Sequence, residues 1–197
     1  MNLPNKLTII RLIFVPLFIL VYLIPYQMLG FHIPTFNILS TKLSLLDIIL
    51  FVIFFVAAFT DFLDGHLARK EKMVTTFGKF MDPIADKLIV NTVLILLAYS
   101  GDISVLIPII MIARDTFVDG IRLVASQNQV VLAASYLGKA KTMIQMIAIG
   151  ILLLHNVIFE MMGIPMDQIM IWLATMISVV SGVDYFIKNS QYILESM

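Results

Sequence analysis

The chain contains no cysteine, few charged residues and a single tryptophan. Without cysteine it can form no disulfide, no thiolate nucleophile and no cysteine-ligated zinc site. Only 13% of its 197 residues are charged, about half the usual share of a soluble domain, whereas 60% are hydrophobic. Its 13 basic and 13 acidic residues balance, so no net positive charge favours nucleic acid as a partner. This composition excludes a soluble globular protein, and its hydrophobicity excludes a disordered chain.

Six stretches are apolar and long enough to cross a bilayer, which takes roughly 20 residues for about 30 Å of hydrocarbon. The first lacks the small-residue cleavage site of a signal peptide, so we predict that it is retained. No shift in composition marks a second domain. We therefore predict an all-α integral membrane protein with one domain, residues 1–197. The six spans are predicted at about Leu7–Pro25, Leu43–Arg69, Thr76–Tyr99, Ile103–Ser126, Leu137–Phe159 and Gln168–Lys188.

Basic residues are distributed unevenly between the two ends of these spans. With a cytoplasmic N-terminus, Lys42 alone of the 13 basic residues lies on the outer side. Cytoplasmic segments of membrane proteins carry an excess of Lys and Arg, so we predict that both termini are cytoplasmic. The inner residues are Lys6, Arg11, Arg69, Lys70, Lys72, Lys79, Lys87, Arg114, Arg122, Lys139, Lys141 and Lys188.

Four aspartates lie in the second and third predicted helices. Asp61 and Asp64 are three residues apart, and Asp82 and Asp86 are four apart, so each pair shares one face of its helix. The connection between the helices is centred near Met73, and Asp64 and Asp82 each lie 9 residues from it. With a rise of about 1.5 Å per residue, Asp64 is level with Asp82 and Asp61 is nearly level with Asp86. We therefore predict that the four carboxylates converge.

Four carboxylates near lipid repel one another, and each is costly to desolvate unless it is paired. Protonation or bound cations would relieve that cost. Ligation by oxygen alone suits Mg²⁺, Mn²⁺ or Ca²⁺, and two such ions about 4 Å apart can clamp a phosphoryl group. The structural alternative is a set of ordinary helix-end charges paired with Lys70, Lys79 and Lys87.

The full pattern D-x2-D-G-x2-A-R-x8-G-x3-D-x3-D runs from Asp61 to Asp86. It resembles the signature of the CDP-alcohol phosphotransferases. The opening Pro4-Asn5-Lys6-Leu7-Thr8-x2-Arg11, together with Ala113-Arg114-Asp115 and Gly138-Lys139-Ala140-Lys141-Thr142, is similar to the branch of that family that makes phosphatidylglycerophosphate. One departure is Asp115, where that branch would have Glu.

The resemblance implies transfer of the phosphatidyl group from CDP-diacylglycerol to sn-glycerol 3-phosphate, with release of CMP. It implies two divalent cations, Mg²⁺ or Mn²⁺, with Asp86 as both metal ligand and general base. It also implies a multi-pass homodimer in the cytoplasmic membrane of a bacterium, with the active site facing the cytoplasm. The implied metal ligands are Asp61, Asp64, Asp82 and Asp86, and the implied contacts to CDP-diacylglycerol are Asn5, Thr8, Gly65, Ala68, Arg69, Thr75 and Gly78.

A phosphorylated acceptor also needs cations that are separate from the metal site. Arg114 in the fourth span and Lys139 and Lys141 at the start of the fifth are candidates, with Arg122 as a further one. Alternatively, Arg114 pairs with Asp115 or Asp119, and the lysines merely follow the distribution of basic residues. The small residues Gly65, Ala68 and Gly78 likewise serve either close helix packing or clearance for a ligand.

Three other functions remain open from the residues alone. An enzyme of the same class with serine, inositol phosphate or phosphatidylglycerol as acceptor would keep the metal site. A cation or proton transporter also uses carboxylates within the membrane, but more often shows repeats or discontinuous helices. A purely structural membrane subunit would not require the pattern from Asp61 to Asp86.

Overall fold

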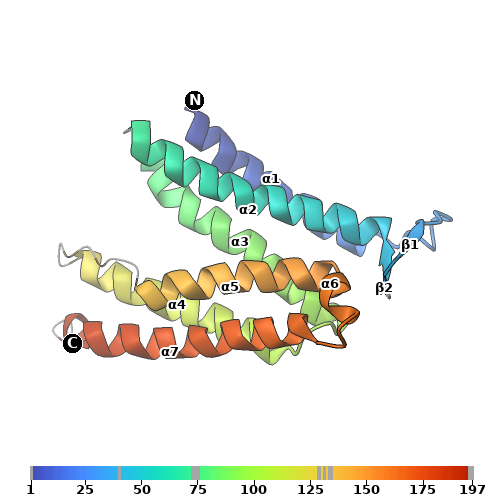
Figure 1. The fold of residues 1–197 in the computed structure, drawn as a ribbon. Helices are drawn as coiled ribbons and strands as arrows, with labels where there is room; N and C mark the ends of the chain where they lie inside the picture. The colour runs from blue at the N-terminus through green and yellow to red at the C-terminus, as the bar shows by residue number, and fades with distance from the viewer. Residues whose placement is uncertain are drawn as a thin grey trace. The chain divides into compact units, whose positions relative to one another are not determined.

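The structure, a computed structural model, describes residues 2–39, 41–71, 76–127, 130, 132 and 135–194. Within this part, side chains are described except at residues 3, 4, 61–71, 76, 79 and 191–194. The described chain is mostly helical and includes a two-stranded hairpin (Figure 1). It divides into two compact units, residues 1–96 with 150–166 and residues 97–149 with 167–197.

Three long helices build the first unit: α1 (Leu3–Leu23), α2 (Leu45–Glu71) and α3 (Thr76–Ser100), which extends into the second unit at its end. α1 packs along α2, and hydrogen bonds also join α1 to α3. The hydroxyl of Thr8 donates to Asp82, and fourteen residues further along both helices the hydroxyl of Tyr22 donates to the Leu96 carbonyl, 3.1 Å away. α1 and α3 are therefore parallel neighbours over about 21 Å.

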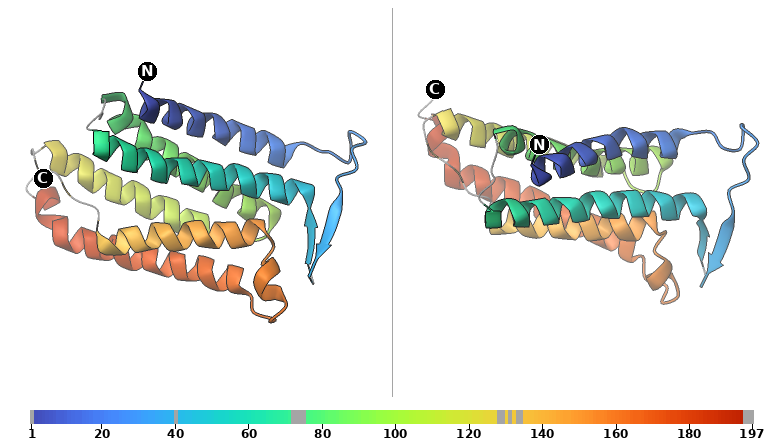
Figure 2. Two further views of the ribbon diagram at one scale, coloured as in Figure 1. Left: turned by 45° about the horizontal axis from the view of Figure 1, so that its top comes forward. Right: turned by 90° about the horizontal axis from the view of Figure 1, so that it is seen from above.

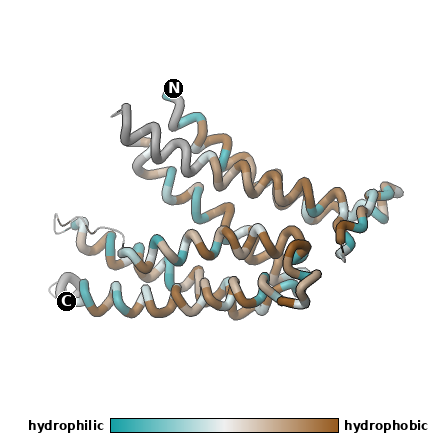
Figure 3. The backbone as a smooth tube through the Cα atoms, viewed as in Figure 1, coloured by the Kyte–Doolittle hydropathy of each residue, from teal (hydrophilic) through white to brown (hydrophobic). Residues whose placement is uncertain are grey.

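Hydrophobic periodicity explains these helices. On α2 the buried residues Leu50, Phe54 and Ala57 recur at spacings of four and three, which places them on one face. The opposite face is also apolar, since Phe55 and Phe59 are about half exposed and their rings stack on each other. Hydrophobic residues dominate the described part of α2, whereas the N-terminal half of α3 carries several hydrophilic positions (Figure 3). Helices that are apolar on all faces are typical of membrane spans.

The second unit contains α4 (Leu106–Gln127), most of α5 (Tyr136–Leu153) and α7 (Met166–Leu194). Val118 and Ile121 of α4 form an apolar cluster with Tyr185 of α7, and Leu132 packs against it. Polar side chains are also buried inside this unit. Among the described residues they include Lys141 and Gln145 on α5 and Thr175, Ser178 and Ser181 on α7.

A helix occupies each of the six predicted ranges, with two local differences. α5 ends at Leu153, earlier than predicted, because His155 and Asn156 adopt left-handed backbone conformations with φ of 49° and 56° before the short α6 (Val157–Glu160). The hairpin of β1 (Thr35–Ile38) and β2 (Thr41–Ser44) was not predicted.

Three helices of the described chain are long and apolar enough to cross a membrane, through the segments Asn5–Leu23, Tyr136–Leu153 and Met166–Ser190. A shorter apolar helical segment, Leu45–Thr60, opens α2. The structure therefore agrees with a helical membrane protein.

Candidate functional site

The N-terminal half of α3 carries two of the four predicted metal ligands. Asp82 and Asp86 lie one turn apart, and both are partly buried. Thr8, fully buried on α1, donates its hydroxyl hydrogen to Oδ1 of Asp82. A carboxylate has two oxygens and about four lone-pair positions, so Asp82 keeps the capacity to bind a further partner.

Three of the predicted CDP-diacylglycerol contacts gather around this hydrogen bond. Thr8 takes part in it directly. Asn5 lies one turn before Thr8 on α1 and is partly buried, and Gly78 lies one turn before Asp82 on α3 and is buried. The contact between α1 and α3 therefore places predicted nucleotide-binding residues beside a predicted metal ligand.

The remaining residues of the pattern lie in the last turns of α2. The backbone there is helical, which puts Asp61 and Asp64 on one face as predicted. Their side chains, like those of Gly65, Ala68 and Arg69, lie outside the described set, and Thr75 lies outside the described residues altogether. The convergence of all four carboxylates stays a prediction.

The carboxylate oxygens that the structure describes on α3 suit a hard divalent cation as ligands. Asp82 and Asp86 offer oxygen ligands, which Mg²⁺ and similar ions prefer. A hydrogen bond that orients a carboxylate, such as the one from Thr8, is usual around bound metals. Among the side chains that the structure describes, no three His, Cys, Asp or Glu residues lie close enough to hold a metal. A complete metal site on this unit therefore requires carboxylates from α2.

The second unit brings together two of the four predicted acceptor-binding cations. Nη1 of Arg114 lies 2.8 Å from Oδ1 of Asp115, and Nζ of Lys141 lies 2.7 Å from Oδ2 of the same carboxylate. Nη2 of Arg114 donates to the hydroxyl of Ser181 on α7. We call these four residues the Arg114 cluster. All are largely or fully buried, with 13% of the Arg114 side chain and 4% of the Lys141 side chain exposed.

The Arg114 cluster is suited to bind an anion. Two largely buried cations, Arg114 and Lys141, share the carboxylate of Asp115. Nε of Arg114 is buried and has no hydrogen-bond partner among the described residues. A guanidinium presents its donors in a planar fork that matches phosphate oxygens. The pairing of Arg114 with Asp115, set out above as the structural alternative, is present beside these features.

Two glycines leave the space that Arg114 occupies. A Cβ atom at Gly182 of α7 would lie 2.9 Å from Cγ of Arg114, and one at Gly138 of α5 would lie 3.1 Å from Oγ of Ser135 and 3.6 Å from Nη2 of Arg114. Gly138 belongs to the motif quoted above, but sequence analysis missed Ser181 and Gly182. Their signal is a small polar residue next to a glycine inside an apolar helix.

The other two predicted acceptor residues lie apart from this cluster. Lys139 is two positions from Lys141, so it projects from a different face of α5, and it is exposed. Arg122 lies about two turns beyond Arg114 on α4. Its Nε donates to the hydroxyl of Tyr185, 3.1 Å away, and its guanidinium lies 5.4 Å from the centre of that ring. Arg122 is thus held by α7.

Comparison with known proteins identifies the family. The family model described as CDP-alcohol phosphatidyltransferase matches residues 1–180, which include all the site residues discussed above except Ser181, Gly182 and Tyr185 on α7. The chain belongs to this family. The CDP-alcohol phosphatidyltransferase signature from Asp61 to Asp86 lies inside the match, so the family predicted from the residue pattern is confirmed.

Individual relatives within the family match the chain almost end to end. A Bacillus subtilis protein named CDP-diacylglycerol–glycerol-3-phosphate 3-phosphatidyltransferase is 42% identical over 188 residues, 95% of each chain. Proteins with the same name from Rickettsia bellii and Haemophilus influenzae are 37% and 34% identical. The similarity to the Rickettsia bellii protein extends over 97% of both chains. The similarity to the Haemophilus influenzae protein extends over 93% of this chain and 91% of that protein.

Proposed function

We propose that this protein transfers the phosphatidyl group of CDP-diacylglycerol to sn-glycerol 3-phosphate, forming phosphatidylglycerophosphate and CMP. The observation that carries this proposal is the end-to-end similarity to family members named for that reaction. The Arg114 cluster supports the choice of acceptor, because a phosphate monoester carries nearly two negative charges at neutral pH. A neutral or zwitterionic acceptor such as serine would gain less from two buried cations.

The reaction removes one proton and exchanges one phosphorus–oxygen bond. A carboxylate oxygen of Asp86 accepts the proton of the acceptor's 1-hydroxyl, as a general base. The resulting oxygen forms a bond to the phosphorus that bears diacylglycerol, and the bond from that phosphorus to CMP breaks. CMP leaves with the electron pair, and the proton passes from Asp86 to solvent.

Asp61, Asp64, Asp82 and Asp86 would hold two divalent cations, Mg²⁺ or Mn²⁺. When bound, these ions supply positive charge against the diphosphate, in a reaction governed by positioning and electrostatics. Thr8 orients Asp82 through its hydroxyl. Removal of divalent cations with a chelator is expected to abolish CMP release, and added Mg²⁺ or Mn²⁺ is expected to restore it. Full activity in a metal-free preparation would contradict this part of the proposal.

Residues of α1 and of the pattern from Asp61 to Asp86 would bind the CDP part of the donor. The guanidinium of Arg69 suits a diphosphate because it can donate two parallel hydrogen bonds. The proposed contacts are Asn5, Thr8, Gly65, Ala68, Arg69, Thr75 and Gly78. On the second unit, Arg114 and Lys141 would bind the acceptor phosphate, with Lys139 and Arg122 as outer cations.

We further propose that α1, α2, α3, α4, α5 and α7 all span the cytoplasmic membrane of a bacterium as one domain. Both termini and the active site would face the cytoplasm, and the family resemblance implies a homodimer. The absence of cysteine allows a direct test, because single cysteines can be introduced without a background. In intact cells an impermeant maleimide is expected to label Lys42→Cys and to spare Lys188→Cys until the cells are permeabilised. The reverse pattern would overturn the topology.

A panel of acceptor alcohols tests the proposed reaction. Purified protein in detergent receives CDP-diacylglycerol with sn-glycerol 3-phosphate, serine, inositol phosphate or phosphatidylglycerol, and CMP release is measured. We expect release with sn-glycerol 3-phosphate alone, and none from the Asp86→Asn variant. Release with serine would assign the chain to another acceptor. No release with any acceptor, from protein shown to be folded, would reject the proposed activity.

A further inference from the structure

The hairpin between α1 and α2 has an apolar face and a polar face. β1 and β2 are antiparallel, and their register pairs Phe36 with Leu43 and Asn37 with Lys42. Paired residues share a face, and successive residues alternate between faces. Leu43 is buried, whereas Phe36 and Ile38 remain 44% and 39% exposed. One face carries Phe36, Ile38, Thr41 and Leu43, and the other carries Thr35, Asn37, Lys42 and Ser44.

The hairpin is joined firmly to α2. The backbone N–H and the hydroxyl of Ser44 both donate to Oδ2 of Asp47, at 2.8 and 2.7 Å, and the backbone N–H of Asp47 donates back to the Ser44 hydroxyl at 3.1 Å. This reciprocal pair is a capping box at the start of the helix. The backbone N–H of Leu45 also donates to the Pro34 carbonyl, 2.9 Å away, at the base of the other strand.

The strands run across the axis of α2 rather than along it (Figure 2). If α2 crosses a bilayer, as proposed above, the hairpin therefore extends along the membrane surface. An isolated two-stranded hairpin is marginally stable in water, so its exposed apolar face needs a cover.

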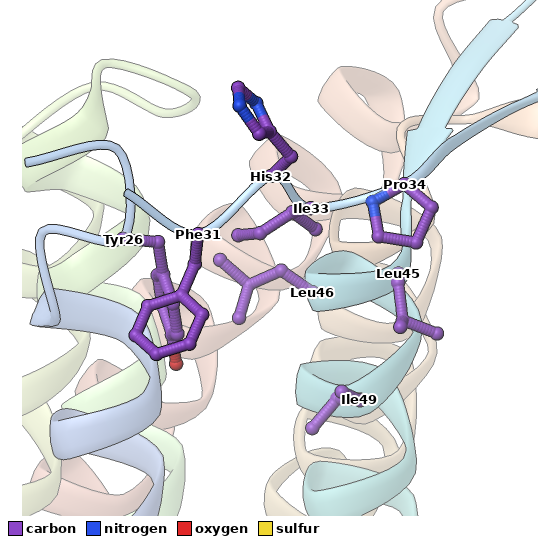
Figure 4. Close-up of a pocket in the computed structure, with 8 residues that line it drawn as sticks. All are labelled: Tyr26, Phe31, His32, Ile33, Pro34, Leu45, Leu46 and Ile49. Carbon is purple, nitrogen blue, oxygen red and sulfur yellow. The ribbon is translucent and has the colours of Figure 1, made fainter. Parts of the chain in front are cut away.

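An apolar pocket of about 290 Å³ opens where the hairpin segment meets α2. Phe31 and Ile33 line it from the loop, and Leu46 and Ile49 line it from the first turns of α2. Figure 4 shows these side chains gathered around the pocket, with the ring of His32 pointing away from them. Its size is close to the lower end of small-molecule pockets, and its walls present almost no polar group.

Charge in the same segment has one sign. From Ile24 to Ser44 the sequence contains no Asp or Glu, and its ionisable basic residues are His32 and Lys42. Lys42 is exposed on the polar face of the hairpin. Apolar and aromatic side chains next to a lysine, in a segment with no acidic residue of its own, are typical of the boundary between lipid headgroups and acyl chains.

We propose that residues 26–39 and 41–44 form a phospholipid-binding surface that lies in this boundary. Phe36 and Ile38 contact acyl chains of the bilayer, and one acyl chain enters the pocket beside Phe31. Lys42, on the opposite face of the hairpin, meets lipid phosphates. The proposal rests on the membrane placement of α1 and α2 and is independent of the transferase chemistry.

Two neighbouring positions of β1 give a matched test. Trp172 is the single tryptophan of the chain, so Trp172→Phe provides a background without indole fluorescence. Phe36→Trp and Asn37→Trp are then placed separately in this background, on opposite faces of the same strand. The full-length variants are reconstituted in nanodiscs of phospholipid brominated near the headgroup end of the acyl chains. We expect bromolipid to quench Phe36→Trp strongly and iodide in the buffer to quench it weakly, with the opposite pattern for Asn37→Trp.

Equal quenching of both reporters by iodide, with none by bromolipid, would overturn the proposal. Protection of Phe36→Trp from both quenchers would also overturn it, because protein, for example a second copy of the chain, would then cover the apolar face. CMP release by each reporter shows that it is folded, since neither position belongs to the proposed catalytic machinery. For a variant without activity, a far-ultraviolet spectrum matching the parent serves instead, so this test does not depend on the proposed reaction.

Discussion

Replacement of Gly182 by alanine is expected to displace Arg114 and so weaken binding of the acceptor phosphate. The new methyl group would lie 2.9 Å from Cγ and 3.6 Å from Nε of Arg114. Carbon atoms in contact lie about 3.5–4.0 Å apart, so one of the two must move by about 0.6–1.1 Å. Cγ lies near the base of the arginine side chain, and its movement therefore carries the whole guanidinium with it.

The size of the effect follows from the contacts that Arg114 makes. The displaced guanidinium loses its 2.8 Å contact with Asp115 and its hydrogen bond to Ser181, which hold it in place for the phosphate. One hydrogen bond to a charged group contributes about 1.5–3 kcal/mol. The KM for sn-glycerol 3-phosphate should accordingly rise by about 10- to 100-fold, because about 1.4 kcal/mol corresponds to a factor of ten. The KM for CDP-diacylglycerol should stay near the wild-type value.

Gly120→Ala on α4 is the matched control, because a Cβ atom there meets no other atom within 4 Å. This variant should keep both KM values and be stabilised by up to about 1 kcal/mol through the higher helix propensity of alanine. Steady-state CMP release at varied concentrations of each substrate measures both KM values in each variant and in the wild type. An unchanged acceptor KM in Gly182→Ala would refute the assignment of Arg114 to the acceptor phosphate.

Three further predictions concern the two sites. Thr8→Val removes the hydroxyl that orients Asp82, so the concentration of Mg²⁺ needed for half-maximal activity should rise by about tenfold. An unchanged Mg²⁺ titration would contradict the role of Thr8. Asp86→Asn should retain CDP-diacylglycerol binding while kcat falls by roughly 10²–10⁴-fold, and a near-normal kcat would move proton removal to another group. Arg114→Ala should raise the acceptor KM by about 10- to 100-fold. Lys139→Ala should raise it much less, since Lys139 is exposed. Equal effects would contradict binding of the acceptor phosphate by the Arg114 cluster.

Hydrophobic runs were sufficient to predict the helices, because a chain surrounded by lipid must satisfy its backbone hydrogen bonds within each segment. They were not sufficient to predict where α5 ends. The run continues through His155 and Asn156, and hydropathy contains no information on the left-handed backbone that these two residues adopt. Asparagine and histidine are enriched in that conformation, so their adjacency was the available signal.

The hairpin was missed because each strand is only four residues long. Alternation of Phe36 and Ile38 with Thr35 and Asn37 is present, but so short a pattern is weak beside the long apolar runs around it. The turn is also unusual, since Leu39 takes a positive φ of 58° where glycine or asparagine is the usual signal.

Contacts between distant residues account for the rest of what the sequence could not predict. The metal-ligand pattern was visible because its members lie on two consecutive helices. The hydrogen bond from Thr8 to Asp82 joins residues 74 positions apart, and no local pattern indicates it. Nε2 of His155 lies 3.3 Å from Oδ2 of Asp47 at the start of α2, and no local pattern indicates this contact either.

The fate of labelled acceptor tests the central proposal most directly. Purified protein in nanodiscs is given CDP-diacylglycerol and sn-glycerol 3-phosphate labelled with ¹⁴C, and label in the lipid phase is compared with CMP released. Transfer by the proposed mechanism predicts one labelled lipid for each CMP, and loss of both products in Asp86→Asn. CMP release without labelled lipid would indicate hydrolysis of the donor and would contradict phosphatidyl transfer to sn-glycerol 3-phosphate.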